Sequence, residues 1–141
     1  MNAHIILIDD DDDDRLLFRE AITSTGFSGV FSEHHSGKSF IDYMDNTDAV
    51  TPCLIFLDIN MPAIDGYTLL KIIRGNRSFG NSNVVMYTTG NNHFDVQFAE
   101  HSQASGFAAK PRDYHRLEEI IQNAVQQFLP PKEPMDFFCM T

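Results

Sequence analysis

Hydrophobic and polar positions along the chain predict an alternation of strands and helices. Three runs of consecutive apolar residues, at 4–8, 53–57 and 84–87, are typical of strands buried on both faces of a sheet. A short run at 107–109 and a weaker, half-polar run at 30–34 predict two further strands. The pattern therefore indicates five strands.

Between these runs, apolar residues recur at the spacing of amphipathic helices. Four helical segments are marked by Leu16, Leu17, Ala21 and Ile22, by Phe40, Ile41 and Met44, by Leu69, Leu70 and Ile73, and by Phe94 and Phe98. The last helix is the clearest and has one apolar stripe, formed by Leu117, Ile120, Ile121, Ala124, Val125 and Phe128. Gly26 is expected to end the first helix and Pro130-Pro131 the last. Five strand–helix units predict an α/β fold, (βα)5, in which helices cover both faces of a parallel sheet.

Length and charge narrow the functional classes. The chain has 141 residues, which suits a single domain, and a formal net charge of −10 at pH 7. A chain this acidic is a poor match for nucleic acid or an anionic membrane surface, because both require positive charge on the protein. No apolar run approaches the ~20 residues of a membrane helix, and no export signal is visible, so we expect a cytoplasmic protein.

Polar residues of particular types follow the predicted strands. Asp9 and Asp10 follow the first strand, Asp58 the third, Thr88 the fourth and Lys110 the fifth. Parallel strands of an open sheet present their carboxyl ends at one edge, where ligands bind, so we expect these side chains to meet. Carboxylates within ~4 Å of one another repel by a few kcal/mol each, and a hard divalent cation such as Mg²⁺ relieves that repulsion.

These residue types fit phosphoryl chemistry. A carboxylate flanked by a metal ion, a lysine and a hydroxyl group can attack phosphorus and form an aspartyl-phosphate. Such a transfer depends mainly on positioning and on neutralisation of charge. The edge of the sheet is therefore predicted to carry a phosphoryl-accepting site.

Asp9 and Asp10 begin a run of six consecutive carboxylates that ends at Asp14. We expect the four residues from Asp11 to Asp14 to be a solvated face, with Asp13 or Asp14 capping the first helix. The spacing of the run partly matches a calcium-binding EF-hand loop, but Asp14 stands where that loop requires glycine. The segment before the run is also a predicted strand rather than a helix, so we reject a calcium loop.

Five short motifs together resemble the receiver domain of two-component response regulators, and the resemblance covers residues 4 to 128. The motifs are Ile6-Leu7-Ile8-Asp9-Asp10-Asp11, Leu57-Asp58-Ile59-Asn60-Met61-Pro62, Asp65-Gly66, Tyr87-Thr88-Thr89-Gly90 and Phe107-Ala108-Ala109-Lys110-Pro111. The resemblance implies a flavodoxin-like, doubly wound, five-stranded parallel sheet of order 2-1-3-4-5.

The resemblance also implies a phospho-acceptor and a metal site. Asp58 corresponds to the aspartate that takes a phosphoryl group from a phosphohistidine. Asp10, Asp58 and the backbone carbonyl of Asn60 correspond to direct Mg²⁺ ligands, with Asp9 acting through a water molecule.

A second group of residues corresponds to the switch of the family. Lys110 would pair with the phosphate, and the Lys110-Pro111 peptide bond would be cis. Thr88 would move to donate a hydrogen bond to a phosphoryl oxygen, and Phe107 would turn inward when Thr88 moves. Many receivers carry tyrosine at the position of Phe107, so this chain keeps the ring but lacks its hydroxyl group.

We therefore read the chain as a stand-alone receiver, with residues 1–129 as the domain and 130–141 as a C-terminal tail without an output domain. It is expected to be a switch rather than an enzyme, phosphorylated in a Mg²⁺-dependent reaction by a sensor histidine kinase or a phosphotransfer protein. Its output would be contact with a downstream protein target. A homodimer could form through the face of the fourth helix, fifth strand and fifth helix, or through the tail.

Two alternatives remain open at this point. The chain could be a degenerate receiver that binds a protein partner constitutively, although the intact set of Asp10, Asp58, Thr88 and Lys110 argues against that. A flavin-binding protein of the same fold would require hydroxyl and glycine residues after the first strand, where this chain has carboxylates. The apolar tail, which contains Phe137 and Phe138, is expected to pack rather than fray, because exposing two phenylalanines to water is unfavourable.

Overall fold

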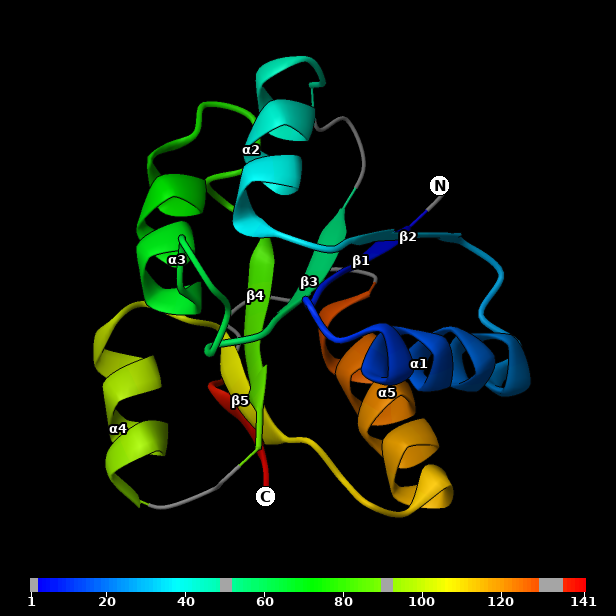
Figure 1. Cartoon of the computed structure of the whole chain (residues 1–141). Helices are drawn as coiled ribbons and strands as arrows, with labels where there is room; N and C mark the ends of the chain where they lie inside the picture. The colour runs from blue at the N-terminus through cyan, green and yellow to red at the C-terminus, as the bar shows by residue number, and fades with distance from the viewer. Residues whose placement is uncertain (1–2, 49–51, 90–92, 130–135) are drawn as a thin grey trace.

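A single parallel sheet organises the fold (Figure 1). The computed structural model describes residues 3–48, 52–89, 93–129 and 136–141. Its strands are β1 (His4–Ile8), β2 (Val30–His34), β3 (Cys53–Leu57), β4 (Asn83–Thr88), β5 (Gly106–Ala109) and β6 (Phe138–Met140). They lie in the order β2-β1-β3-β4-β5-β6, and every pairing is parallel. The predicted order 2-1-3-4-5 is confirmed, and one further strand joins at the β5 edge.

Within the ranges that the structure describes, five helices cover the two faces of the sheet, as predicted. They are α1 (Asp12–Thr25), α2 (Gly37–Asp45), α3 (Gly66–Gly75), α4 (His93–His101) and α5 (Tyr114–Phe128). Helices α1 and α5 lie on one face, and α2, α3 and α4 lie on the other (Figure 1). Among the described residues, no helix is long and apolar enough to cross a membrane.

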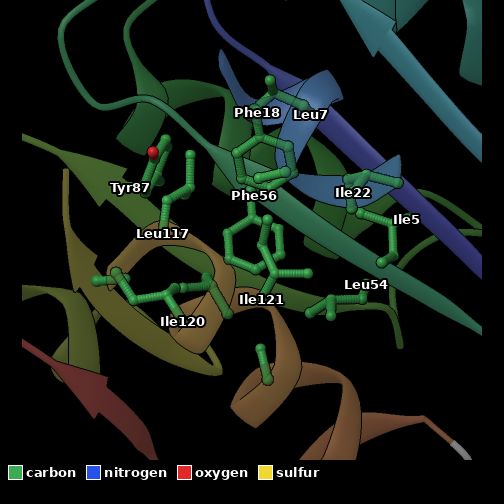
Figure 2. Close-up of a cluster of buried hydrophobic side chains, with 14 of the residues drawn as sticks. Ile5, Leu7, Phe18, Ile22, Leu54, Phe56, Tyr87, Leu117, Ile120 and Ile121 are labelled. Atoms are coloured by element: carbon green, nitrogen blue, oxygen red, sulfur yellow. The ribbon is translucent and has the colours of Figure 1, made fainter. Parts of the chain in front are cut away.

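Alternating residues of each central strand supply the two cores. In β1, Ile5 and Leu7 pack toward α1 and α5, whereas Ile6 and Ile8 pack toward the other helices. Both sides are fully buried, which explains why the strand reads as a continuous apolar run. Figure 2 shows the α1/α5 side, where Phe18 meets Phe56 edge to face with ring centroids 5.0 Å apart.

The first helix differs from the prediction at its start and on its surface. Asp11, rather than Asp13 or Asp14, is the N-cap, because its carboxylate accepts a hydrogen bond from the backbone N–H of Asp14 at 2.9 Å. Leu16 and Leu17 are 45% and 47% exposed, since Phe18, Ala21 and Ile22 form the face of α1 that meets the sheet. The helix ends as predicted at Gly26, which has a φ of 74°.

The C-terminal tail packs against its own domain over the part that the structure describes. Phe138 is 5% exposed, and its ring centroid lies 5.8 Å from that of Phe128 on α5. A Cβ on Gly106 of β5 would lie only 2.5 Å from the Phe138 carbonyl oxygen, so β6 can approach this closely because residue 106 is glycine. Packing of the tail is thereby confirmed for residues 136–141. The proposed helix stop at Pro130-Pro131 and the residue Gly90 lie outside the described residues.

Candidate functional site

The predicted polar residues gather at the carboxyl edge of the sheet. Asp9 directly follows β1, Asp58 follows β3, Thr88 ends β4 and Lys110 follows β5. Asp9, Asp58 and Thr88 are 0%, 4% and 3% exposed, so each is a polar group taken out of water. Burial of polar groups is unfavourable unless hydrogen bonds or opposite charges compensate it, so the partners of these three residues need to be identified.

The side chain of Lys110 joins the strands at this edge. Its Nζ lies 2.8 Å from Asp9 Oδ2, 2.8 Å from Asp14 Oδ2 and 3.4 Å from Asp58 Oδ2. The ammonium group also lies 5.5 Å from the centre of the Tyr87 ring. One positive charge is thus shared among three carboxylates, and the site retains net negative charge.

Burial and charge change the protonation equilibria of the site. The pKa of Asp58 is raised to about 7, chiefly because burial disfavours the charged carboxylate; Asp9 adds to the rise, while Lys110 opposes it. Burial likewise raises the pKa of Asp9, against the stabilising contacts from Lys110 and the backbone of Asp11. The pKa of Lys110 is raised despite burial, because Asp14, Asp9 and Asp58 favour its ammonium form.

Three carboxylates are placed to share a cation. Oxygen atoms of Asp9, Asp10 and Asp58 lie within 4.8 Å of one another. Asp9 Oδ2 is buried, and although the Lys110 ammonium lies beside it, no donor among the described residues is aligned to hydrogen-bond to it. Three carboxylates that share only one ammonium among their described contacts fit a hard cation such as Mg²⁺, which takes oxygen ligands and retains water. The residues present therefore fit the predicted ion.

Asn60 and Thr88 connect the loop after β3 to the end of β4. The backbone N–H of Asn60 donates to Asp58 Oδ1 at 3.1 Å, and its side-chain amide donates to Thr88 Oγ1 at 3.2 Å. Behind this loop, a Cβ on Gly66 would lie 2.4 Å from the Asp58 carbonyl oxygen. Glycine at the start of α3 is thus what permits the helix to approach the Asp58 backbone so closely.

Phe107 does not reach this cluster. It is fully buried in the core on the α2, α3 and α4 side, together with Met86 and Ala99. Of the predicted site residues, the structure brings together Asp9, Asp10, Asp58, Asn60, Thr88 and Lys110. Phe107 lies among apolar neighbours, and Pro111, which follows Lys110 in the chain, is partly exposed.

Two residues at the site were not predicted from the sequence. The sequence predicts Asp14 on a solvated face, but its carboxylate contacts the Lys110 ammonium. No motif marks Arg15, yet its Nη1 donates to the Asp9 carbonyl oxygen at 2.7 Å. The missing information was the helix boundary, because an N-cap at Asp11 turns residues 14 and 15 toward the end of β1.

Comparison with known proteins agrees with this geometry. The family model for the response regulator receiver domain matches residues 5–122. The chemotaxis protein CheY of Bacillus subtilis is 25% identical over 125 residues, which span 89% of this chain and 99% of that protein.

Solved structures show the same fold. A response regulator receiver domain from Rhodospirillum rubrum matches with a TM-score of 0.78 and 24% identity, covering 94% of this chain and 98% of its own. The phosphorylated cyanobacterial phytochrome response regulator RcpA matches with a TM-score of 0.79 and 22% identity, covering 92% and 95% of the two chains.

Proposed function

The chain belongs to the response regulator receiver domain family, and from this premise we propose that Asp58 is its phospho-acceptor. A carboxylate oxygen of Asp58 attacks the phosphorus of a phosphohistidine on a kinase or phosphotransfer protein. A P–O bond to Asp58 forms as the P–N bond breaks, and the histidine leaves with the electrons of that bond. The observation that carries the proposal is the single ammonium of Lys110 lying within 3.4 Å of both Asp9 and Asp58 oxygens.

The chain's own residues prepare Asp58 for this step. Its Oδ1 accepts the backbone N–H of Asn60, which fixes the rotation of the carboxylate. Lys110 supplies a positive charge beside Oδ2, where the phosphoryl oxygens would gather. Both groups are in place before the reaction, so little reorganisation is required when charge develops.

The ligands that we propose for Mg²⁺ are Asp10, Asp58 and the backbone carbonyl of Asn60, with Asp9 acting through water. When bound, the ion would neutralise charge on the carboxylates and on the phosphoryl oxygens. The support is the cluster of Asp9, Asp10 and Asp58, whose carboxylate oxygens lie within 4.8 Å of one another.

The switch that we propose begins at Thr88. Its hydroxyl accepts a hydrogen bond from the Asn60 side chain at 3.2 Å, and this bond would break when Thr88 turns to donate to a phosphoryl oxygen. Space vacated by Thr88 would allow Phe107 to repack. Phosphorylation adds roughly −1.5 to −2 charges at Asp58. This charge would interact more favourably with the conformation in which Thr88 has turned toward it, and so would shift the equilibrium to that conformation.

The partners follow from this assignment. A sensor histidine kinase or phosphotransfer protein would supply the phosphoryl group, and a downstream protein would read the surface of α4, β5 and α5. Residues 1–129 would act as the receiver and residues 130–141 as its C-terminal tail, of which Phe138–Met140 extend the sheet as β6. Self-association through that surface or through the tail remains a prediction that the oligomeric state in solution would test.

Beryllofluoride provides the direct test, because it mimics a phosphoryl group on a carboxylate. Incubation with Mg²⁺ and beryllofluoride should yield a one-to-one adduct on the wild-type protein and none on Asp58→Ala. Omission of Mg²⁺ should weaken the adduct strongly. Absence of an adduct on the wild type would refute phospho-acceptance and favour a degenerate receiver that binds its partner constitutively.

A further inference from the structure

The contact between Asp14 and Lys110 has no part in the mechanism above. Asp14 Oδ2 lies 2.8 Å from the ammonium, closer than Asp58 Oδ2 at 3.4 Å. The side chain of Lys110 is 10% exposed and that of Asp14 is 34% exposed, so the pair is partly shielded from solvent. Such a pair interacts more strongly than a fully exposed one.

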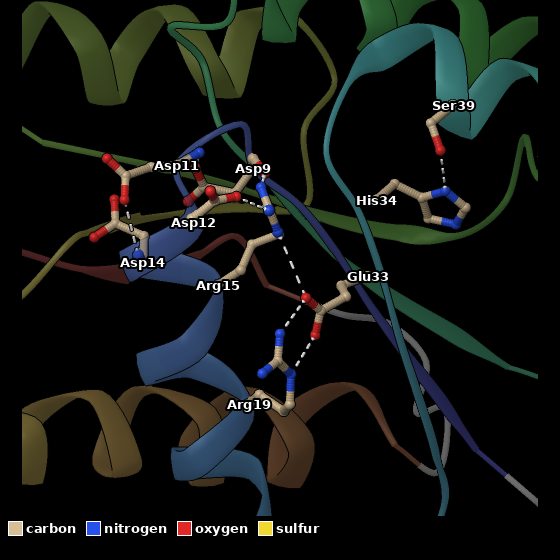
Figure 3. A network of polar contacts seen from close by, with 9 residues as sticks. All are labelled: Asp9, Asp11, Asp12, Asp14, Arg15, Arg19, Glu33, His34 and Ser39. Atoms are coloured by element: carbon tan, nitrogen blue, oxygen red, sulfur yellow. Dashed lines mark hydrogen bonds and ion pairs between the residues drawn. The ribbon is translucent and has the colours of Figure 1, made fainter.

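The position of Asp14 is set by a closed ring of contacts at the start of α1. Asp9 Oδ1 accepts the backbone N–H of Asp11 at 3.0 Å, and Asp11 Oδ1 accepts that of Asp14 at 2.9 Å. The Asp14 carboxylate then contacts Lys110, which returns to Asp9 Oδ2 at 2.8 Å. Figure 3 shows the acidic part of this ring, with Asp9, Asp11 and Asp14 at the N-terminal end of α1.

We propose that Asp14 is a positioning residue that holds the Lys110 ammonium on the α1 side of the site and so competes with a phosphoryl group on Asp58 for it. The inference rests on the proposed function, since it assumes that Lys110 binds the phosphoryl group. Asp14 thereby limits how tightly the phosphorylated state is held. It acts through Lys110 and needs no contact with the phosphoryl group itself.

Replacement of Asp14 by asparagine tests this competition. The side chain keeps its size, and the helix cap is retained because Asp11 bonds the backbone of residue 14 rather than its side chain. The released ammonium would keep its contact with Asp9 and move toward Asp58, where it opposes a metal ion but favours an anion. We expect Asp14→Asn to bind Mg²⁺ more weakly and, at saturating Mg²⁺, to bind beryllofluoride about fivefold more tightly.

Asp13 offers a matched control. It lies on the same helical turn, carries the same charge and is exposed. Asp13→Asn removes one negative charge without touching Lys110, and we expect it to change beryllofluoride affinity by less than about twofold, because solvent and salt screen an exposed charge. Asp14→Glu retains the charge on a partly exposed, flexible side chain, so its beryllofluoride affinity should return toward the wild-type value.

Calorimetric titration of the full chain measures both affinities. The inference is supported if Asp14→Asn binds beryllofluoride more tightly than the wild type, while Asp13→Asn and Asp14→Glu bind it with about the wild-type affinity. Equal affinities in Asp14→Asn and Asp13→Asn would overturn it while leaving Asp58 as the acceptor. Weaker binding of both ligands in Asp14→Asn would also overturn it, because that result indicates loss of site structure rather than release of Lys110. If the wild type forms no adduct, the proposed function fails and the inference fails with it.

Discussion

Neutralising Asp58 should stabilise the metal-free protein. The carboxylate is 4% exposed, and its pKa is raised from 3.8 to about 7, chiefly by burial and further by Asp9. A rise from 3.8 to about 7 corresponds to about 4 kcal/mol of preference for the neutral form. At pH 8 we expect Asp58→Asn to raise the free energy of unfolding by only about 1–2 kcal/mol. The gain is smaller than the full preference because the folded protein relaxes around the charge in the wild type, and because the new amide group must find its own hydrogen-bond partners.

The pH dependence gives the sign of this effect. Between pH 4 and 7 the folded state binds the Asp58 proton more tightly than the unfolded state, so the wild type loses stability as the pH rises through about 7. At pH 5 the wild-type carboxyl is largely protonated and the advantage of Asp58→Asn should shrink. Addition of Mg²⁺ at pH 8 should also shrink it, since the ion compensates the charge in the wild type.

Urea denaturation at pH 5 and pH 8, in EDTA and in Mg²⁺, measures these differences. Asp13→Asn is the control, because it removes an exposed charge and should change the free energy of unfolding by less than ~0.5 kcal/mol. A destabilised Asp58→Asn at pH 8, or a gain that is the same at both pH values, would refute the assignment of Asp58 as a buried, under-compensated carboxylate.

Three further predictions concern packing and pH. Gly106→Ala should expel β6, because its Cβ would lie 2.5 Å from the Phe138 carbonyl oxygen. Thermal denaturation should show a loss of stability of about 2 kcal/mol in the full chain, but little loss in a chain truncated after residue 129. Gly66→Ala should destabilise the protein by at least ~2 kcal/mol and weaken beryllofluoride binding, since its Cβ would lie 2.4 Å from the Asp58 carbonyl oxygen. A stable variant that binds beryllofluoride normally would contradict the close packing of α3 against the Asp58 backbone. Burial lowers the pKa of His34, so stability should fall as the pH drops below about 6.5; His34→Gln should lack that component of the pH profile.

Most of the architecture follows from local patterns in the chain. Strands buried on both faces require continuous apolar runs, so β1, β3 and β4 are visible as such in the chain. Asp9, Asp58, Thr88 and Lys110 could be predicted to converge because each follows a strand and parallel strands share one edge. These inferences need only local pattern and the general geometry of parallel sheets.

Features that depend on how whole helices and strands rotate and dock emerge only in the folded molecule. Which face of α1 meets the sheet determines that Leu16 is exposed, and where that helix begins determines that Asp14 reaches Lys110. The pairing of β6 with β5 depends on the space left by Gly106, 32 residues before Phe138. Contacts between residues so far apart along the chain leave little local signal, because apolar periodicity fixes which residues share a face but not what that face will touch.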